Sequence, residues 1–210
     1  MPFNTRAAGS SALATRRAAW LGAAALGWFG LGALPLSARA NALQVGQSAP
    51  PATLVALDGK HWNTEDLRGQ VIILTFWATW CEPCREELPL LSAYASQHAA
   101  EGLTVLAISV DSLDQLEPVR AIARTLKFPV GLLATSNAAG YGRMWRLPVS
   151  FTIGRDGRLV DNGWKDSRPV WTQERLERIV APLLSEAYPH KQESAAPISG
   201  QGQDRIGHRD

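Results

Sequence analysis

The chain has 210 residues, with 21 Lys and Arg, 19 Asp and Glu, and two cysteines. The formal charge of +2 provides no basic excess for binding nucleic acid, and two cysteines exclude a small fold held together by several disulfides. The part of the chain after residue 40, about 170 residues, is long enough for one domain with its own hydrophobic core.

Residues 1–40 have the composition of a secretory signal peptide. They contain four arginines and no acidic residue, and the run 18–38 is uncharged and largely apolar. The small residues of Ala38–Ala40 offer a cleavage site at the end of this segment. We therefore predict export. An uncleaved anchor is the alternative, because about 20 apolar residues can span a bilayer, and Arg16–Arg17 loosely matches a twin-arginine signal.

Removal of this segment would change the charge of the protein. The remainder would keep 17 basic and 19 acidic side chains, a formal charge of about −2. We therefore expect no nucleic-acid partner, and contact with a membrane only through the N-terminal segment if it is uncleaved. Cleaved or not, the rest of the chain is expected in the periplasm or another extracytoplasmic compartment.

Hydrophobic periodicity and turn residues predict the elements of the remaining chain. Continuous β-branched runs indicate buried strands, a spacing of three to four indicates helices, and D-G pairs indicate hairpin turns. In chain order the elements are a hairpin at 53–62, a capped helical turn at 63–70, a central strand at Val71–Trp77, a helix at 86–102 kinked by Pro89, a strand at 103–110, a helix at 113–127, a short strand at 128–135, a short helix at 137–145, a hairpin at 149–164 and a helix at 169–188. Residues 189–210 are polar and aperiodic, and are predicted to be a disordered tail.

This order predicts an α/β fold, in which a mixed central sheet is flanked by helices and preceded by an N-terminal β-hairpin extension. Strands joined through helices run parallel, whereas the hairpin at 149–164 adds an antiparallel pair. We expect one domain over residues 41–188.

The two cysteines, Cys81 and Cys84, lie where the first buried strand ends and a helix begins. In open α/β sheets this end of a strand is where chemistry is usually placed. A structural disulfide, half of a metal site and a redox-active pair are the three interpretations. A disulfide that closes so short a loop constrains little of the unfolded chain, which weakens the first.

The metal interpretation lacks ligands. A zinc site needs four, but there is no second C-x-x-C and the four histidines have no short spacing. A two-coordinate Cu(I) site on Cys81 and Cys84 stays open, because soft thiolates suit Cu(I). A peroxidase would need Pro and Thr or Ser upstream of its cysteine, and Leu74 and Ala78 stand there, so we reject that interpretation.

A redox pair suits the expected geometry. Cys81 at a helix N-terminus faces unpaired N–H groups and the positive end of the helix dipole, which favour the nucleophilic thiolate. Cys84, one turn further, brings its sulfur within bonding reach and is predicted to be the more buried, resolving thiol. Pro83 suits an early helical position, and Glu82, if ionised, opposes formation of the Cys81 thiolate.

The segment "FWATWCEPCREELP", residues 76–89, resembles the active site of the TlpA/ResA group of thioredoxin-like thiol–disulfide oxidoreductases. The CcmG/DsbE cytochrome c maturation reductases are close relatives of this group. A second match, "LPVSFTIGRDGRLV" at residues 147–160, resembles its cis-proline loop and hairpin. The resemblance covers about residues 44–184. It implies a thioredoxin-like fold and a redox-active Cys81–Cys84 disulfide, with no other cofactor.

The resemblance also implies roles for single residues. Cys81 and Cys84 match the nucleophile and the resolving cysteine, and Pro148 matches a proline held cis beside them, whose neighbours receive a substrate strand. Without the resemblance, Pro148 reads as an ordinary strand-start proline. The residues expected to contact substrate are Trp80, Glu82, Pro83 and Leu147.

Glu87 matches a partly buried glutamate that this group places near the resolving cysteine. A carboxylate one turn beyond Cys84 can take the thiol proton, and burial would raise its pKa towards neutrality. The alternative is a solvated helix glutamate like Glu86. Thr75 stands where thioredoxin has a buried aspartate, which leaves Glu87 as the candidate for the proton.

The function implied is reduction of disulfides in client proteins outside the cytoplasm. The C-x-x-C-H segment of an apocytochrome c or the cysteines of a copper-site protein are candidate clients, and a membrane electron donor would have to supply the electrons. A Cu(I)-binding chaperone using the same cysteines and a DsbA-like oxidant are the alternatives. The sequence shows no long helical insertion of the kind such oxidants usually carry.

Overall fold

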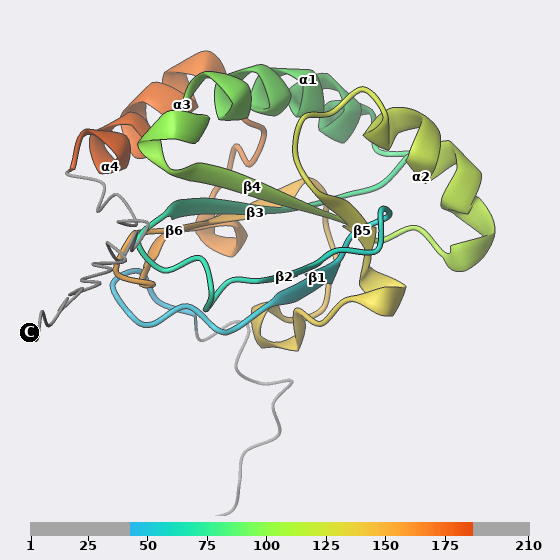
Figure 1. The fold of residues 1–210 in the computed structure, drawn as a ribbon, viewed down its shortest axis with the longest axis horizontal. Coiled ribbons are helices and arrows are strands. Elements are labelled where there is room, and N and C mark those ends of the chain that lie inside the picture. Colours follow the sequence, from blue (N-terminus) through green and yellow to red (C-terminus); the bar gives the residue numbers. More distant parts are fainter. Residues whose placement is uncertain (1–42, 187–210) are drawn as a thin grey trace, which may run out of the picture. The chain divides into compact units, whose positions relative to one another are not determined.

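The computed structural model describes residues 43–186, in which a five-stranded sheet has the order β5-β4-β3-β6-β7 (Figure 1). The predicted signal peptide and C-terminal tail lie outside the described residues. The strands of this sheet are β3 (Val71–Trp77), β4 (Leu103–Ser109), β5 (Val130–Leu132), β6 (Val149–Ile153) and β7 (Leu159–Asn162). The helices are α1 (Glu82–Gln97), α2 (Leu116–Ala123), α3 (Gln173–Ile179) and α4 (Ala181–Ser185).

The central strand β3 organises the sheet. It pairs in parallel with β4, from Val71 opposite Leu103 to Trp77 opposite Ser109, and antiparallel with β6. All of its residues are buried, because both faces of the sheet are covered at this strand, and this explains its nearly continuous apolar sequence. The mixed sheet predicted from the sequence is therefore confirmed.

Successive residues of β3 face two separate cores, because side chains alternate along a strand. Val71, Ile73 and Trp77 pack into the core that also holds both cysteines, Trp171 and residues of α1, α2 and α3. The intervening side chains Ile72, Leu74 and Phe76 pack into a second core with residues of the N-terminal hairpin. Figure 1 shows α1, α3 and α4 above the sheet and the hairpin below it.

The N-terminal hairpin is also confirmed. Its strands β1 (Thr53–Val55) and β2 (His61–Asn63) pair antiparallel across the turn at Asp58–Gly59, where Gly59 has a φ of 86°. The hairpin joins the sheet edge through an N–H···O bond of 2.8 Å from Leu57 to Val130.

Several helix predictions need correction. The predicted helical turn at 63–70 is not a helix: Asn63 ends β2 and residues 64–70 form turns, although the Asn63 side chain accepts a bond from the Glu65 N–H as a cap would. The helix predicted at 137–145 is only a 3₁₀ turn, Ala139–Tyr141, because Gly142 takes a φ of 88° and ends it.

The other predicted helices differ at their ends. The helix expected at 86–102 is α1, which begins at Glu82 and continues through Pro89; a 3₁₀ turn then leads to Gly102. The helix expected at 113–127 begins as a 3₁₀ turn, Leu113–Gln115, before α2. The segment 169–188 divides at Val180 into α3 and α4, because Pro182 has no N–H to continue the first helix.

Among residues 43–186, no helix is both long enough and apolar enough to cross a membrane.

Candidate active site

The two cysteines form a disulfide where β3 gives way to α1. The Sγ–Sγ distance is 2.06 Å and the Cα–Cα distance is 5.3 Å. Cys81 is the N-cap residue of α1, and Pro83 occupies the first turn, where its missing N–H has no helical partner to lose. Cys81 is 5 % exposed and Cys84 is 0 % exposed, so Cys81 is the more accessible of the two cysteines.

The loop before Cys81 is held by a buried aspartate at the end of β4. The Asp111 carboxylate accepts hydrogen bonds from the Thr79 N–H (2.8 Å), the Thr79 hydroxyl (2.8 Å) and the Ser109 hydroxyl (2.7 Å). These bonds fix the loop that presents Cys81. Asp111 was not among the predicted site residues, although a polar residue just after a buried parallel strand is a signal for a site.

The start of β6 lies beside this loop. Val149 pairs with Phe76, so Pro148 lies one residue beyond the ladder, at the end of β3 that leads to Cys81. The Leu147–Pro148 peptide bond is cis, as the resemblance implied. Pro148 is buried, and the half-buried Leu147 packs against the core that contains both cysteines.

Exposed side chains surround the disulfide in the sequence. Trp80 is 71 % exposed, and Glu82 and Pro83 are also exposed, so all three can meet a client protein. Trp145, three residues before Pro148, is an exposed aromatic that the sequence analysis did not single out. Its ring stacks on Trp164, with 5.3 Å between ring centroids and an interplanar angle of 15°.

Glu87 is buried, in contrast to the exposed Glu86. It is 1 % exposed, and its Oε2 accepts a hydrogen bond of 2.8 Å from the Trp171 N–H. Its Oε1 has no partner of good hydrogen-bond geometry among the described residues. Burial is expected to raise the pKa of such a carboxyl, because it penalises the charged form.

At Glu87 the effect of burial on the pKa outweighs the opposing effects of the neighbouring groups. Removal from water raises the pKa of Glu87, and the Trp171 N–H, the charge of Arg175 and the Thr75 hydroxyl lower it in part. The net result is a pKa of about 7. Near neutral pH this carboxyl is therefore divided between its two protonation states, which suits a group that takes and returns a proton.

Thr75 supplies no second carboxylate. It is buried, and its Oγ1 accepts a hydrogen bond of 2.8 Å from the Ser150 hydroxyl. The buried acidic side chains of residues 43–186 are Glu87 and Asp111, and Asp111 is already committed to the Thr79 loop. Of these two buried acids, Glu87 is the one on the helix of Cys84. Within the same residues, no cluster of three His, Cys, Asp or Glu could hold a metal ion.

Comparison with known proteins agrees with this geometry. The model of the AhpC/TSA family matches residues 45–161. The chain belongs to this family. It is 32 % identical over 119 residues to the thiol-disulfide oxidoreductase ResA of Bacillus thuringiensis (strain Al Hakam), a match that covers 57 % of the chain and 69 % of ResA.

Two solved structures extend the comparison. A Chlorobium tepidum protein assigned as thiol:disulfide interchange protein DsbE has a TM-score of 0.53 and 26 % identity, over 68 % of this chain and 99 % of that one. A secreted thiol-disulfide isomerase of Corynebacterium glutamicum has a TM-score of 0.55 and 25 % identity, over 66 % and 86 %. The fold is thus thioredoxin-like, and this AhpC/TSA family member is a thiol–disulfide oxidoreductase of the ResA/DsbE type.

Asp111→Asn should destabilise the oxidised protein by about 2 kcal/mol, because an amide cannot replace the carboxylate in all three hydrogen bonds and leaves buried donors unpaired. Urea unfolding measures this loss. The control is Asp114→Asn, an exposed position nearby that bonds only to Ser112 and Gln115, where the change should stay within about 0.5 kcal/mol. Equal losses at the two positions would show that the Asp111 bonds do not hold the loop.

Glu87→Gln should change how stability depends on pH. The folded pKa of about 7 lies above the ordinary 4.5, so the wild type loses stability as pH rises between these values and the carboxyl must ionise while buried. Above pH 7 this loss corresponds to about 3 kcal/mol. The difference in unfolding free energy, variant minus wild type, should therefore increase by that order from pH 4.5 to pH 8. A difference that does not vary with pH would show that Glu87 titrates normally.

Proposed function

We propose that the protein reduces disulfides of client proteins in an extracytoplasmic compartment, with Cys81 as the attacking and Cys84 as the resolving thiol. The observation that carries the proposal is the buried Glu87 carboxyl, one turn beyond Cys84 and with a pKa of about 7. A structural disulfide has no use for a proton acceptor at that place, whereas a resolving thiol must lose its proton before it attacks.

The reaction begins with the reduced pair. The Cys81 thiolate attacks one sulfur of the client disulfide, and the client's other sulfur leaves as a thiolate that takes a proton from water. Cys84 then gives its proton to the Glu87 carboxylate and attacks the Cys81 sulfur. The second client thiolate leaves and is protonated, so two electrons pass to the client and the Cys81–Cys84 disulfide forms.

The charges at the site favour transfer of electrons from the cysteine pair to the client. An oxidant such as DsbA is strong because its reduced form is stabilised, chiefly by a favoured thiolate. Here Glu82 follows Cys81 directly in the first turn of α1, and a carboxylate at Glu87 follows Cys84 by one turn. Both oppose negative charge on the sulfurs, so the reduced form is less stabilised and gives up its electrons more readily.

The client surface is assigned to the exposed groups around the disulfide. Trp80 directly precedes Cys81, Glu82 and Pro83 follow it, and the backbone beside the cis bond of Leu147–Pro148 receives an extended client segment. Candidate clients are an apocytochrome c before haem attachment and proteins with copper-site cysteines, as the resemblance to the TlpA/ResA and CcmG/DsbE groups implies. A membrane electron donor returns two electrons and two protons to the pair.

The reduction potential tests the direction of the reaction. After equilibration with glutathione or dithiothreitol buffers, the Cys81–Cys84 pair should show a potential nearer that of thioredoxin, about −270 mV, than that of DsbA, about −120 mV. Alkylation of the free thiols followed by mass analysis reads the oxidised fraction. A value near −120 mV would contradict a reductase, and tightly bound copper without disulfide exchange would favour a Cu(I) chaperone.

The two cysteines should behave differently when each is replaced. Cys84→Ser should trap a stable mixed disulfide with a client through Cys81, because no resolving thiol remains. Cys81→Ser should trap little, because Cys84 is fully buried. Non-reducing gels followed by peptide mapping identify the bonded sulfur. Trapping mainly through Cys84 would reverse the assignment.

A further inference from the structure

A buried ion-pair cluster lies behind the active site. The Arg175 side chain on α3 is 3 % exposed, and its Nη2 lies 2.7 Å from Asp161 on β7 and 2.9 Å from Asp166. A buried ion pair of this kind adds little to stability by itself, because removing charges from water offsets their attraction. We therefore consider a role for the Arg175 ion pairs other than stabilising the fold.

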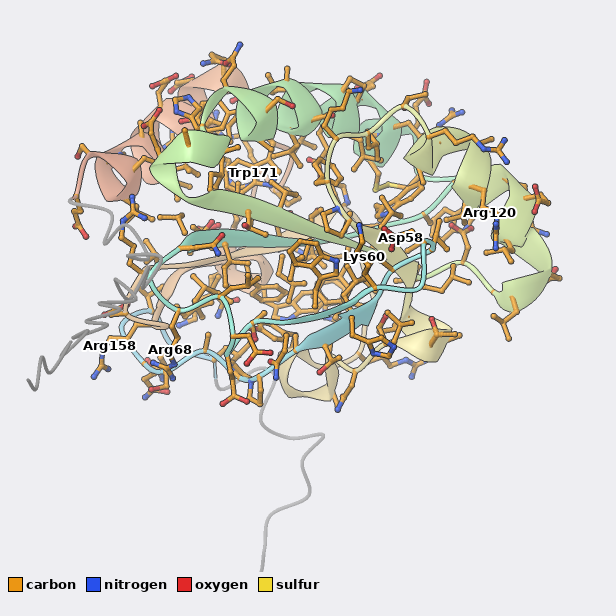
Figure 2. All side chains as sticks on the ribbon, in the orientation of Figure 1. Asp58, Lys60, Arg68, Arg120, Arg158 and Trp171 are labelled. Carbon is orange, nitrogen blue, oxygen red and sulfur yellow. A yellow bond between two sulfur atoms is a disulfide. The ribbon has the colours of Figure 1, made fainter. Side chains whose placement is uncertain are left out.

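Arg175 also holds the segment that precedes α3. Its guanidinium carbon lies 4.1 Å from the centroid of the Trp171 ring, and its Nη1 donates to the Pro169 carbonyl. Trp171 is 2 % exposed and belongs to the core that contains both cysteines. Figure 2 shows Trp171 beneath α1, between the helices and the sheet.

The same segment reaches the active-site carboxyl. The Trp171 N–H donates to Oε2 of Glu87 at 2.8 Å. The groups that act on Glu87 come from three elements: the Trp171 N–H before α3, the Arg175 charge on α3 and the Thr75 hydroxyl on β3. On its own helix, Cys84 lies one turn away, bonded to Cys81 in the oxidised state.

These groups oppose the effect of burial. Burial raises the pKa of Glu87, and the Trp171 hydrogen bond and the Arg175 charge are the two largest influences that lower it. Without them the carboxyl would stay protonated at neutral pH and could not accept a proton from Cys84.

We propose that Arg175 is a positioning residue for thiol–disulfide exchange, which keeps Glu87 able to ionise by holding the Trp171 N–H on its carboxyl and by placing a positive charge nearby. This rests on the proposed function, in which Glu87 accepts the Cys84 proton. Asp161 and Asp166 anchor the guanidinium from the side of β7, so the cluster couples that edge of the sheet to the active site.

Replacement of Arg175 should shift the titration of Glu87 in one direction. Arg175→Gln removes the positive charge and leaves Asp161 and Asp166 without their partner, and both changes disfavour a carboxylate at Glu87. The midpoint of Glu87 titration should therefore rise. Arg175→Lys keeps a charge at the same place and should restore much of the wild-type behaviour.

The test is a carbon-13 NMR titration of the oxidised protein, labelled at the glutamate side-chain carboxyls. The Glu87 signal is identified as the one missing from the spectrum of Glu87→Gln. Arg175→Gln should raise its midpoint by about half a pH unit or more, a threefold change in the ratio of acid to carboxylate. Arg175→Lys should bring it back, and Arg178→Gln, an exposed control on α3 that pairs with Glu174, should leave it unchanged.

A correctly folded Arg175→Gln variant with the wild-type midpoint would overturn the proposal. If that variant does not fold, Asp161→Asn combined with Arg175→Gln removes one unpaired acid. A smaller rise in the Glu87 midpoint is then expected, from the lost positive charge, and a midpoint equal to that of Asp161→Asn alone would overturn the proposal. The titration needs no client and no catalysis. Absence of thiol–disulfide exchange in the wild type would therefore overturn the proposed function, while the titration would still decide whether Arg175 acts on Glu87.

Discussion

The site depends on one buried carboxyl that has a single strong hydrogen bond. Glu87 is nearly inaccessible to water, and within residues 43–186 its one hydrogen bond of good geometry comes from the Trp171 N–H. A carboxyl in that position resists ionisation, because burial penalises its charge more than one N–H, a guanidinium and a hydroxyl compensate. Its place one turn beyond Cys84 and its pKa of about 7 are the reasons for which we propose it as the acceptor of the Cys84 proton.

The fold brings the parts of the site together from distant parts of the sequence. The end of β3 delivers Cys81, and Asp111 at the end of β4 fixes the loop in between. The antiparallel pairing of β6 with β3 places the cis Pro148 at the same end of the sheet. The segment before α3 then covers α1 and supplies the Trp171 N–H, which the ion pairs of Arg175 secure.

Much of this arrangement follows from local sequence. The strand Val71–Trp77 was predicted with its observed ends, because a strand buried on both faces is a nearly continuous apolar run. The first hairpin followed from its D-G turn. The cysteine spacing placed the two sulfurs within bonding reach at a helix start, and the redox-active disulfide itself was implied by the family resemblance. The expected helices at 137–145 and 169–188 were wrong in extent, because glycine conformations and a proline decide where such segments break. The Asp111 and Arg175 contacts join residues from different elements, and no local pattern identifies such pairs.

The proton-acceptor role of Glu87 is tested most directly by the rate at which Cys84 resolves a mixed disulfide on Cys81. Reduced protein treated with an aromatic disulfide releases one coloured thiolate on attack and a second on resolution, and stopped-flow absorbance separates the two steps. Glu87→Gln should slow the second step alone, about tenfold to a hundredfold, and remove its dependence on a group of pKa near 7. Glu86→Gln, exposed on the same helix, should leave both steps unchanged. Equal, small effects of the two substitutions on resolution would contradict the account.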